Sequence, residues 1–347
     1  MENHLHIEIS SGSILRAIAL ILFFVLLYLL KDILVVLLFA IIIASAVSPF
    51  ANWLESKKFP RLLSVLMLYL MIFGAVILLV SLVVPFVSSD LVQLTSIFPK
   101  IVDKVSSSLD VVQQGSPRYF DFLSEVQNLL DLFSNYLQQI SQSAISLLIS
   151  VFGGMFSFVA IIVISFYLSV MKKGVEAFLE SVVPRRYEDY AVDLWQRAET
   201  KVGRWLQGQL LLALVVGLVV YVGLSLMGMK FALVFGMLAM LLEIVPVAGP
   251  VLAAIPAIFL AFIENPTLGI WVLVFYIVVQ QLENHILVPI VLGKTTGLNP
   301  VVVIIALLVG ANLAGIAGAI LSVPLATVLV EVLDDIAKHK EMMHSKA

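Results

Sequence analysis

The chain has 347 residues, of which 61% are hydrophobic and only 12% are charged, and its mean hydropathy is +1.11. A water-soluble globular domain carries roughly 25% charged residues, so this composition excludes that class and indicates a membrane protein. The chain has no cysteine, which excludes disulfides, cysteine-bound metals and thiol nucleophiles. Its net charge of -3 gives no indication of nucleic-acid binding.

The N-terminus does not have the form of a cleaved signal peptide. A polar stretch, Met1 to Ser13, leads into an apolar run of spanning length, and no small-residue cleavage site follows it. We therefore expect the whole chain to be present in the mature protein.

Apolar runs long enough to cross roughly 30 Å of hydrocarbon recur along the chain. Five lie in the first two thirds, and a sixth follows Pro266, a residue suited to a first helical turn. The predicted spans are Ile14 to Leu30, Ile33 to Phe50, Leu62 to Val87, Ala144 to Met171, Leu206 to Met227 and Thr267 to Leu282. The sequence therefore predicts an all-α polytopic membrane protein.

Lysine and arginine placement predicts which side of the membrane each loop faces. Lys57, Lys58 and Arg61 follow the second span, and residues 172–204 are also rich in basic side chains. Residues 87–143 instead hold three basic and six acidic residues. Because basic loops stay in the cytoplasm, both termini are predicted to be cytoplasmic.

Two amphipathic segments lie outside the predicted spans. Residues 87–143 repeat apolar side chains at helical spacing on both sides of a Gly115-Ser116-Pro117 break, which predicts an external helical hairpin. It is expected to be a spacer or subunit contact, or alternatively a lid. Tyr187 to Val202 is predicted to lie along the membrane before the fifth span, as an anchoring or coupling helix.

Two apolar stretches in the last third are interrupted by glycine and proline. Phe231 to Glu243 is only about 20 Å long as a helix and leads through a Gly/Pro-rich break into Val251 to Ile263. A similar break follows Pro300 to Val309. Paired breaks of this kind point to a transporter's binding site, so we expect two re-entrant or broken hairpins that meet near the membrane midplane. Two pairs of full spans are the alternative.

Polar residues near these breaks are the candidate site. Glu243 lies at membrane depth, where a carboxylate is costly and is usually functional, although it could instead cap a wet turn. Gln280, Glu283 and Asn284 share a helix face and either line a polar path or lie in the headgroup zone. His285 is more simply an incidental interfacial residue than a proton relay. The candidate substrate or ion pathway comprises Glu243, Pro246, Gly249, Pro250, Pro256, Gln280, Glu283, Asn284, Asn312, Gly315, Gly318 and Pro324.

Sequence motifs for enzymes and pumps are missing from the chain. It has no GxxxxGK[ST] phosphate loop, no HExxH zinc motif and no GxSxG serine motif. We therefore predict no enzymatic activity, no catalytic residue, no metal and no cofactor, and expect transport to be secondary or passive. A membrane scaffold is the non-transport alternative.

The Gly/Pro-rich motifs of the last third resemble the autoinducer-2 exporter family of bacterial membrane permeases. The resemblance is carried by residues 243–250 with Pro256, by Gln281 to Asn284 with Pro289, Gly293, Gly297, Leu298 and Pro300, and by Gly310 and Gly315 to Gly318 with Pro324. It covers most of the chain and is specific for the family, but not for a substrate.

The resemblance implies a multi-pass protein of the bacterial inner membrane. Expected features are about eight membrane segments, a homo-oligomer such as a pentamer, and a transport domain that moves elevator-fashion against a scaffold. Members are associated with export of autoinducer-2, a small polar quorum-sensing signal, and others with Na⁺(Li⁺)/H⁺ antiport. For antiport, Glu243 or Glu283 would supply the titrating carboxylate.

We therefore predict a secondary transporter that exports a small polar, autoinducer-2-like solute, with Na⁺(Li⁺)/H⁺ antiport as the alternative. Its expected partners are that solute or a monovalent cation and a proton, together with the lipid bilayer, and no nucleic acid. The predicted divisions are a scaffold of three spans (1–86), the external hairpin (87–143), span four with the basic helix (144–204), the transport core (205–337) and a cytoplasmic tail (338–347).

Overall fold

The computed structural model describes residues 11–75, 77–78, 154–171, 173–291 and 298–344. These residues form helices and their connections, with no β-strand among them. The all-α prediction is confirmed for this part of the chain. The predicted external helical hairpin, residues 87–143, lies outside it.

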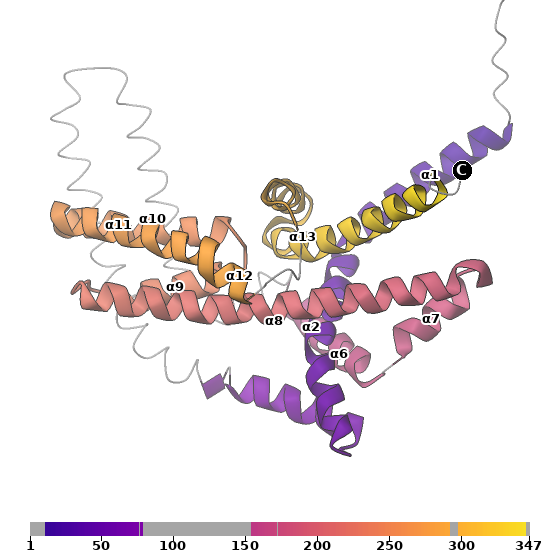
Figure 1. Cartoon of the computed structure of the whole chain (residues 1–347), viewed down its shortest axis with the longest axis horizontal. Coiled ribbons are helices and arrows are strands. Elements are labelled where there is room, and N and C mark those ends of the chain that lie inside the picture. Colours follow the sequence, from indigo (N-terminus) through magenta and orange to yellow (C-terminus); the bar gives the residue numbers. More distant parts are fainter. Residues whose placement is uncertain (1–10, 76, 79–153, 172, 292–297, 345–347) are drawn as a thin grey trace, which may run out of the picture.

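The helices follow one another in the order shown by the colour gradient of Figure 1. They are α1 (Ser11–Leu29), α2 (Lys31–Ser56), a helix at Arg61–Ala75, α6 (Met155–Val170), α7 (Gly174–Val182), the short η1 (Arg185–Tyr187), α8 (Glu188–Leu226), α9 (Ala232–Leu242), α10 (Ala248–Glu264), α11 (Pro266–Leu282), the π-helical η2 (Glu283–Leu287), α12 (Val288–Val291) and α13 (Pro300–His344).

Several of these helices can cross a membrane. By length and composition, four in the described residues qualify: Lys31–Ser56, Arg185–Leu226, Pro266–Val291 and Val301–Ala337. The bent pair α6 and α7 would make a fifth. Large apolar side chains along α1 and on the outer faces of α2, α8 and α11 are exposed, as expected of surfaces that meet lipid. The chain is a multi-pass membrane protein, and the total of eight segments stays a prediction.

Among the described residues, the longest uninterrupted helix is α8, which extends across the width of the structure in Figure 1. Residue 204, where the predicted basic helix adjoins the predicted transport core, lies inside this helix. The structure has no break there, because no proline interrupts residues 188–226 and the helical backbone continues through Gly203. The amphipathic segment and the apolar span therefore form one continuous helix.

Glycines along α8 let other helices approach its backbone closely. A Cβ atom at Gly203 would lie 2.3 Å from the Ser45 carbonyl oxygen of α2, and one at Gly217 would lie 2.9 Å from the Gly236 carbonyl oxygen of α9. Small residues allow this kind of contact between membrane helices, where dispersion rather than the hydrophobic effect holds the helices together. The first half of α8 thus packs on α2, and the second half packs on α9.

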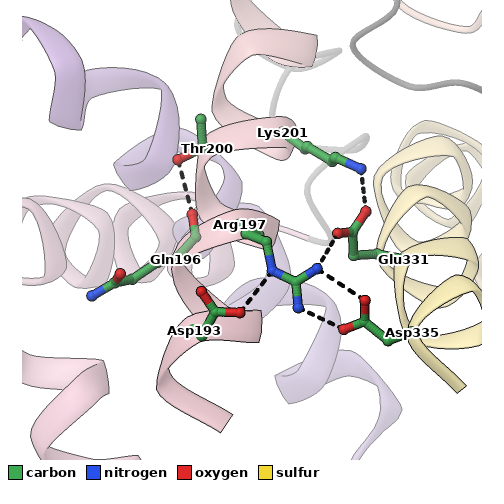
Figure 2. A network of polar contacts seen from close by, with 7 residues as sticks. All are labelled: Asp193, Gln196, Arg197, Thr200, Lys201, Glu331 and Asp335. Carbon is green, nitrogen blue, oxygen red and sulfur yellow. Dashed lines mark hydrogen bonds and ion pairs between the residues drawn. The ribbon is translucent and has the colours of Figure 1, made fainter. Parts of the chain in front are cut away.

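An ion-pair network joins the first half of α8 to the last part of α13 (Figure 2). The Arg197 guanidinium donates from Nη1 to Glu331 and from Nη2 to Asp335, each at 2.5 Å, and from Nε to Asp193 at 3.0 Å. Lys201 donates to the second oxygen of Glu331. Arg197 and Lys201 are four residues apart on α8, and Glu331 and Asp335 are four residues apart on α13. Each pair therefore lies on one face of its helix, and the two faces of opposite charge meet. This network fixes α13 against α8.

The Gly203 contact makes a direct prediction. Gly203→Leu should lower the free energy of unfolding by about 1–3 kcal/mol, because the new side chain would have to push α2 away. Thermal unfolding in detergent would measure the change. Gly74→Leu is the matched control, since nothing lies within 4 Å of a Cβ there; equal losses in both variants would show that α2 and α8 do not pack through Gly203.

Candidate functional site

The first predicted break is present between α9 and α10. The α9 helix ends at Leu242, α10 begins at Ala248, and the two helices pack together across the connecting turn. A Cβ atom at Gly249 would lie 1.9 Å from the Leu242 carbonyl oxygen. Only glycine fits this position, so its role in the structure is to let the two helices close on each other.

Val247 holds the turn in a strained conformation. Its φ is 67° and its ψ is -52°, and the Ala248 N–H donates to the Pro246 carbonyl at 2.7 Å. This geometry is a γ-turn, which is rare for any residue and an outlier for a β-branched one. Such strain costs of order 1–3 kcal/mol and concentrates at functional sites.

Glu243 lies at the start of this turn and is buried, with only 1% of its surface exposed. Gln209 of α8, itself buried, donates from its side-chain amide to the Glu243 carbonyl oxygen. The broken end of α9 is therefore held by a side chain from α8, which supplies a donor for a carbonyl group at the end of the helix.

Glu283 approaches Glu243 from the other side. The buried face of α11 runs through Gly269, Val272, Tyr276 and Val279, and at the same three- and four-residue spacing the next position is Glu283. Glu283 is 4% exposed and begins the π-helical turn η2, a distortion often found at functional sites. The carboxyl groups of Glu243 and Glu283 lie within hydrogen-bonding reach of each other.

This carboxyl pair is incompletely satisfied. The Oε2 atoms of both glutamates are buried and have no hydrogen-bond partner. The hydroxyl group of Tyr276 is also buried without a partner. An unpaired buried polar group costs about 1–3 kcal/mol. The structure thus keeps three such groups within one apolar region formed by α8 to α11.

Gln280 and Asn284 lie beside Glu283, but not on its buried side. Gln280 is within hydrogen-bonding reach of the Glu283 carboxyl group, and its amide also contacts the Asn284 side chain at 3.5 Å. Asn284 is exposed, as is His285, whose Nδ1 contacts the Gln281 carbonyl oxygen at 3.0 Å. Glu283 alone of these residues points into the protein interior.

The three prolines of the first break occupy different places. Pro246 lies in the turn and is half-buried, Pro250 is buried in the first turn of α10, and Pro256 is buried inside α10. Proline is well tolerated in a first turn because no intrahelical donor is lost there. The prolines therefore shape α10 and its entry, and none of them carries a polar group toward the glutamates.

The second predicted break is also present. Residues 300–344 are two helices joined by a kink, since Ala314 and Gly315 have non-helical backbone angles and Gly315 has a φ of 59°. A Cβ atom at Gly310 would lie 2.3 Å from the Gly318 carbonyl oxygen, so the two arms turn back and touch. Asn312 and Gly315 are exposed at this turn, whereas Gly318 and Pro324 are buried.

The two hairpins pack in different hydrophobic clusters. The first belongs to a cluster with the second half of α8 and with α11, including Phe235 and Val272. The second contributes Leu321 and Val323 to a cluster with α2, α6 and Trp205 of α8. The predicted site residues therefore form two groups, with Glu243, Gly249 and Glu283 in the first, and a meeting of the hairpins stays a prediction.

A polar cavity between α2, α6, α7 and α8 was not singled out from the sequence. Its lining includes Ser48, Arg61, Glu176 and Glu199. Ser48 donates to Glu199 at 3.0 Å and Gln196 donates to Glu176 at 2.8 Å, so these polar groups bind one another. Ser48 lies in α2 and Arg61 begins the next helix, and their positions in the sequence carry no spacing signal that would have identified the cavity. Across the described ranges, no three histidine, aspartate or glutamate side chains gather to hold a metal ion.

The known proteins that this chain resembles are described as transport proteins. Residues 17–338 match the sequence model described as "AI-2E family transporter". The chain is 28% identical over 293 residues to "Putative transport protein YueF" of Bacillus subtilis, covering 81% of this chain and 78% of that protein. It is 27% identical over 310 residues to "AI-2 transport protein TqsA" of Escherichia coli, covering 87% and 85% respectively.

The Gln209 contact predicts how the first break is stabilised. Gln209→Leu should lower the free energy of unfolding by about 1–3 kcal/mol, because it leaves the buried Glu243 carbonyl oxygen without its donor. Thermal unfolding in detergent would detect this loss. Gln281→Leu makes the same replacement at an exposed position of α11 and should change little; a comparable loss there would contradict a specific role for Gln209.

Proposed function

This chain belongs to the AI-2E family of transporters, and on that premise we propose that it is a secondary transporter that exports a small polar solute of the autoinducer-2 type. Membership of the family supports transport in general. The solute class is taken from the name of TqsA, an AI-2 transport protein that is 27% identical to this chain. The same relationship, with the basic loops after α2 and before α8, supports a place in the bacterial inner membrane with both termini in the cytoplasm.

The observation that carries the proposal is the strained break between α9 and α10. An unpaired buried carboxyl oxygen of Glu243 next to a γ-turn at Val247 is costly in a protein that only anchors or scaffolds other components. A transporter needs such a break, because backbone and polar side chains at membrane depth can receive a polar solute. The break therefore favours transport over the scaffold alternative.

Gly249 is not the floor of a solute cavity in this proposal. Its Cα lies against the Leu242 backbone, so the space beside it is already filled by protein. We assign solute binding instead to the region of Glu243, Gln280 and Glu283, where the α9–α10 turn meets α11 and η2. The second hairpin, with Asn312 and Gly315 exposed at its turn, is the other surface that we assign to the pathway.

The alternative of Na⁺(Li⁺)/H⁺ antiport is favoured by one specific feature. Glu243 and Glu283 are buried carboxyl groups within an apolar cluster, the type of residue that binds cations or protons in membrane transporters. In this alternative the same turn carries a cation, and no organic solute is needed.

Transport of labelled autoinducer-2 into or out of vesicles that contain the purified protein tests the proposal. We expect solute flux above that of protein-free vesicles, and Gly249→Leu should abolish it because the added side chain forces α9 and α10 apart. Gly74→Leu adds the same side chain in open space and should retain flux.

The antiport alternative is measured in the same vesicles with a pH-sensitive dye inside. Proton movement driven by Na⁺ or Li⁺, with no autoinducer-2 flux, would replace the exporter proposal by the antiporter. An absence of both fluxes from folded protein would contradict both functions and favour the scaffold.

A further inference from the structure

We propose that Glu243 and Glu283 form one proton-binding site, in which the two carboxyl groups share a single proton while the α9–α10 turn is packed against α11. Coupling of this proton to transport rests on the proposed function. The binding of the proton itself does not depend on it. The two side chains come from separate elements, so the site exists only when these elements are in contact.

The first reason is the contact between the two carboxyl groups. They lie within hydrogen-bonding reach of each other, yet two carboxylates are both acceptors and have no hydrogen to donate. One proton between them makes one group a donor to the other and removes one of two adjacent negative charges. A shared proton is the form in which like carboxyl groups coexist at close range.

The second reason is the lack of any other compensating charge. Among the described residues, the charged group that each carboxyl faces is the other carboxyl. The neighbouring elements contribute Gln209 from α8, Tyr276 and Gln280 from α11, and apolar side chains from α9 and α10. The remaining charged residues here, Lys230 and Glu264, pair with each other at 3.9 Å at the far end of α10.

The third reason is the orphaned oxygen on each side chain. Glu243 and Glu283 are 1% and 4% exposed, and each keeps one Oε2 atom without a partner. Neutralising one carboxyl group lowers the cost of leaving such atoms out of water. A proton suits this arrangement as it stands, because no further ligand has to fit between the two groups.

The site also provides a release step. When the α9–α10 turn moves away from α11, water reaches both carboxyl groups, the carboxylic O–H bond breaks, and the proton passes to water, leaving two separate carboxylates. Closing the turn reverses each event. Opening and closing on opposite sides of the membrane would therefore carry one proton per cycle.

Infrared difference spectroscopy of the full-length protein in lipid tests this proposal without any transported solute. The wild-type protein should show the carbonyl band of a protonated carboxylic acid that is shielded from water, and the band should disappear on alkalinisation. Both Glu243→Gln and Glu283→Gln should lose it, because in either variant the remaining carboxylate accepts from the new amide and needs no proton. Glu264→Gln, at the exposed end of α10, should retain the band.

Three results would overturn the shared site. They are a wild-type protein with no such band, a band that survives in Glu283→Gln and therefore belongs to Glu243 alone, and a band that is lost from Glu264→Gln. If a glutamine variant fails to fold, Gln280→Leu provides the answer: it removes a donor to Glu283 and should shift the band, whereas an unchanged band would place the proton elsewhere. A loss of solute flux with the band intact would contradict the proposed function and leave the site standing.

Discussion

Close backbone packing along α8 is the interaction on which the described structure depends. This helix contacts α2, α7, α9, α11, α12 and α13, and several of these contacts pass over glycines where a side chain would not fit. In a bilayer, apolar side chains gain little by leaving lipid, so close van der Waals contact and buried polar interactions must hold helices together. Both broken hairpins therefore pack against the same uninterrupted helix, α8.

Polar groups are paired near the first half of α8 and incompletely paired near its second half. Near its start, Arg197 and Lys201 meet Glu331 and Asp335 in a network in which opposite charges face each other. Beyond Gln209, the polar groups that pack near α8 are Glu243, Glu283 and Tyr276, each with a buried atom that lacks a partner. The first arrangement fixes α13 against α8, whereas the second leaves buried polar atoms without partners, which costs free energy.

Much of the helical framework could be predicted from the sequence, because apolar runs and proline positions are local signals. The run Thr267 to Leu282 corresponds to α11, and the Gly/Pro-rich segments near Pro250 and Gly315 mark real breaks. The continuity of α8 was missed, since a change from amphipathic to apolar sequence suggests a boundary that the backbone does not need.

The site was predicted only in part, because its decisive contact is between distant residues. Glu243 and Glu283 were each identified, but nothing in a single sequence states that they touch. The buried spacing that leads through Tyr276 and Val279 to Glu283 was the available signal for its direction. Gly249 was predicted to belong to the substrate or ion pathway; its tight packing against the Leu242 backbone is a second contact that a single sequence does not reveal.

We propose that the α9–α10 turn carries the exported solute and that its transport is coupled to the proton held by Glu243 and Glu283. Simultaneous recording of labelled autoinducer-2 flux and internal pH, in vesicles containing either wild-type protein or Glu243→Gln, tests it most directly. The account predicts that both signals are present in the wild-type protein and that the proton signal is lost and solute flux falls in the variant. Solute flux of wild-type size and unchanged proton movement in Glu243→Gln would contradict it.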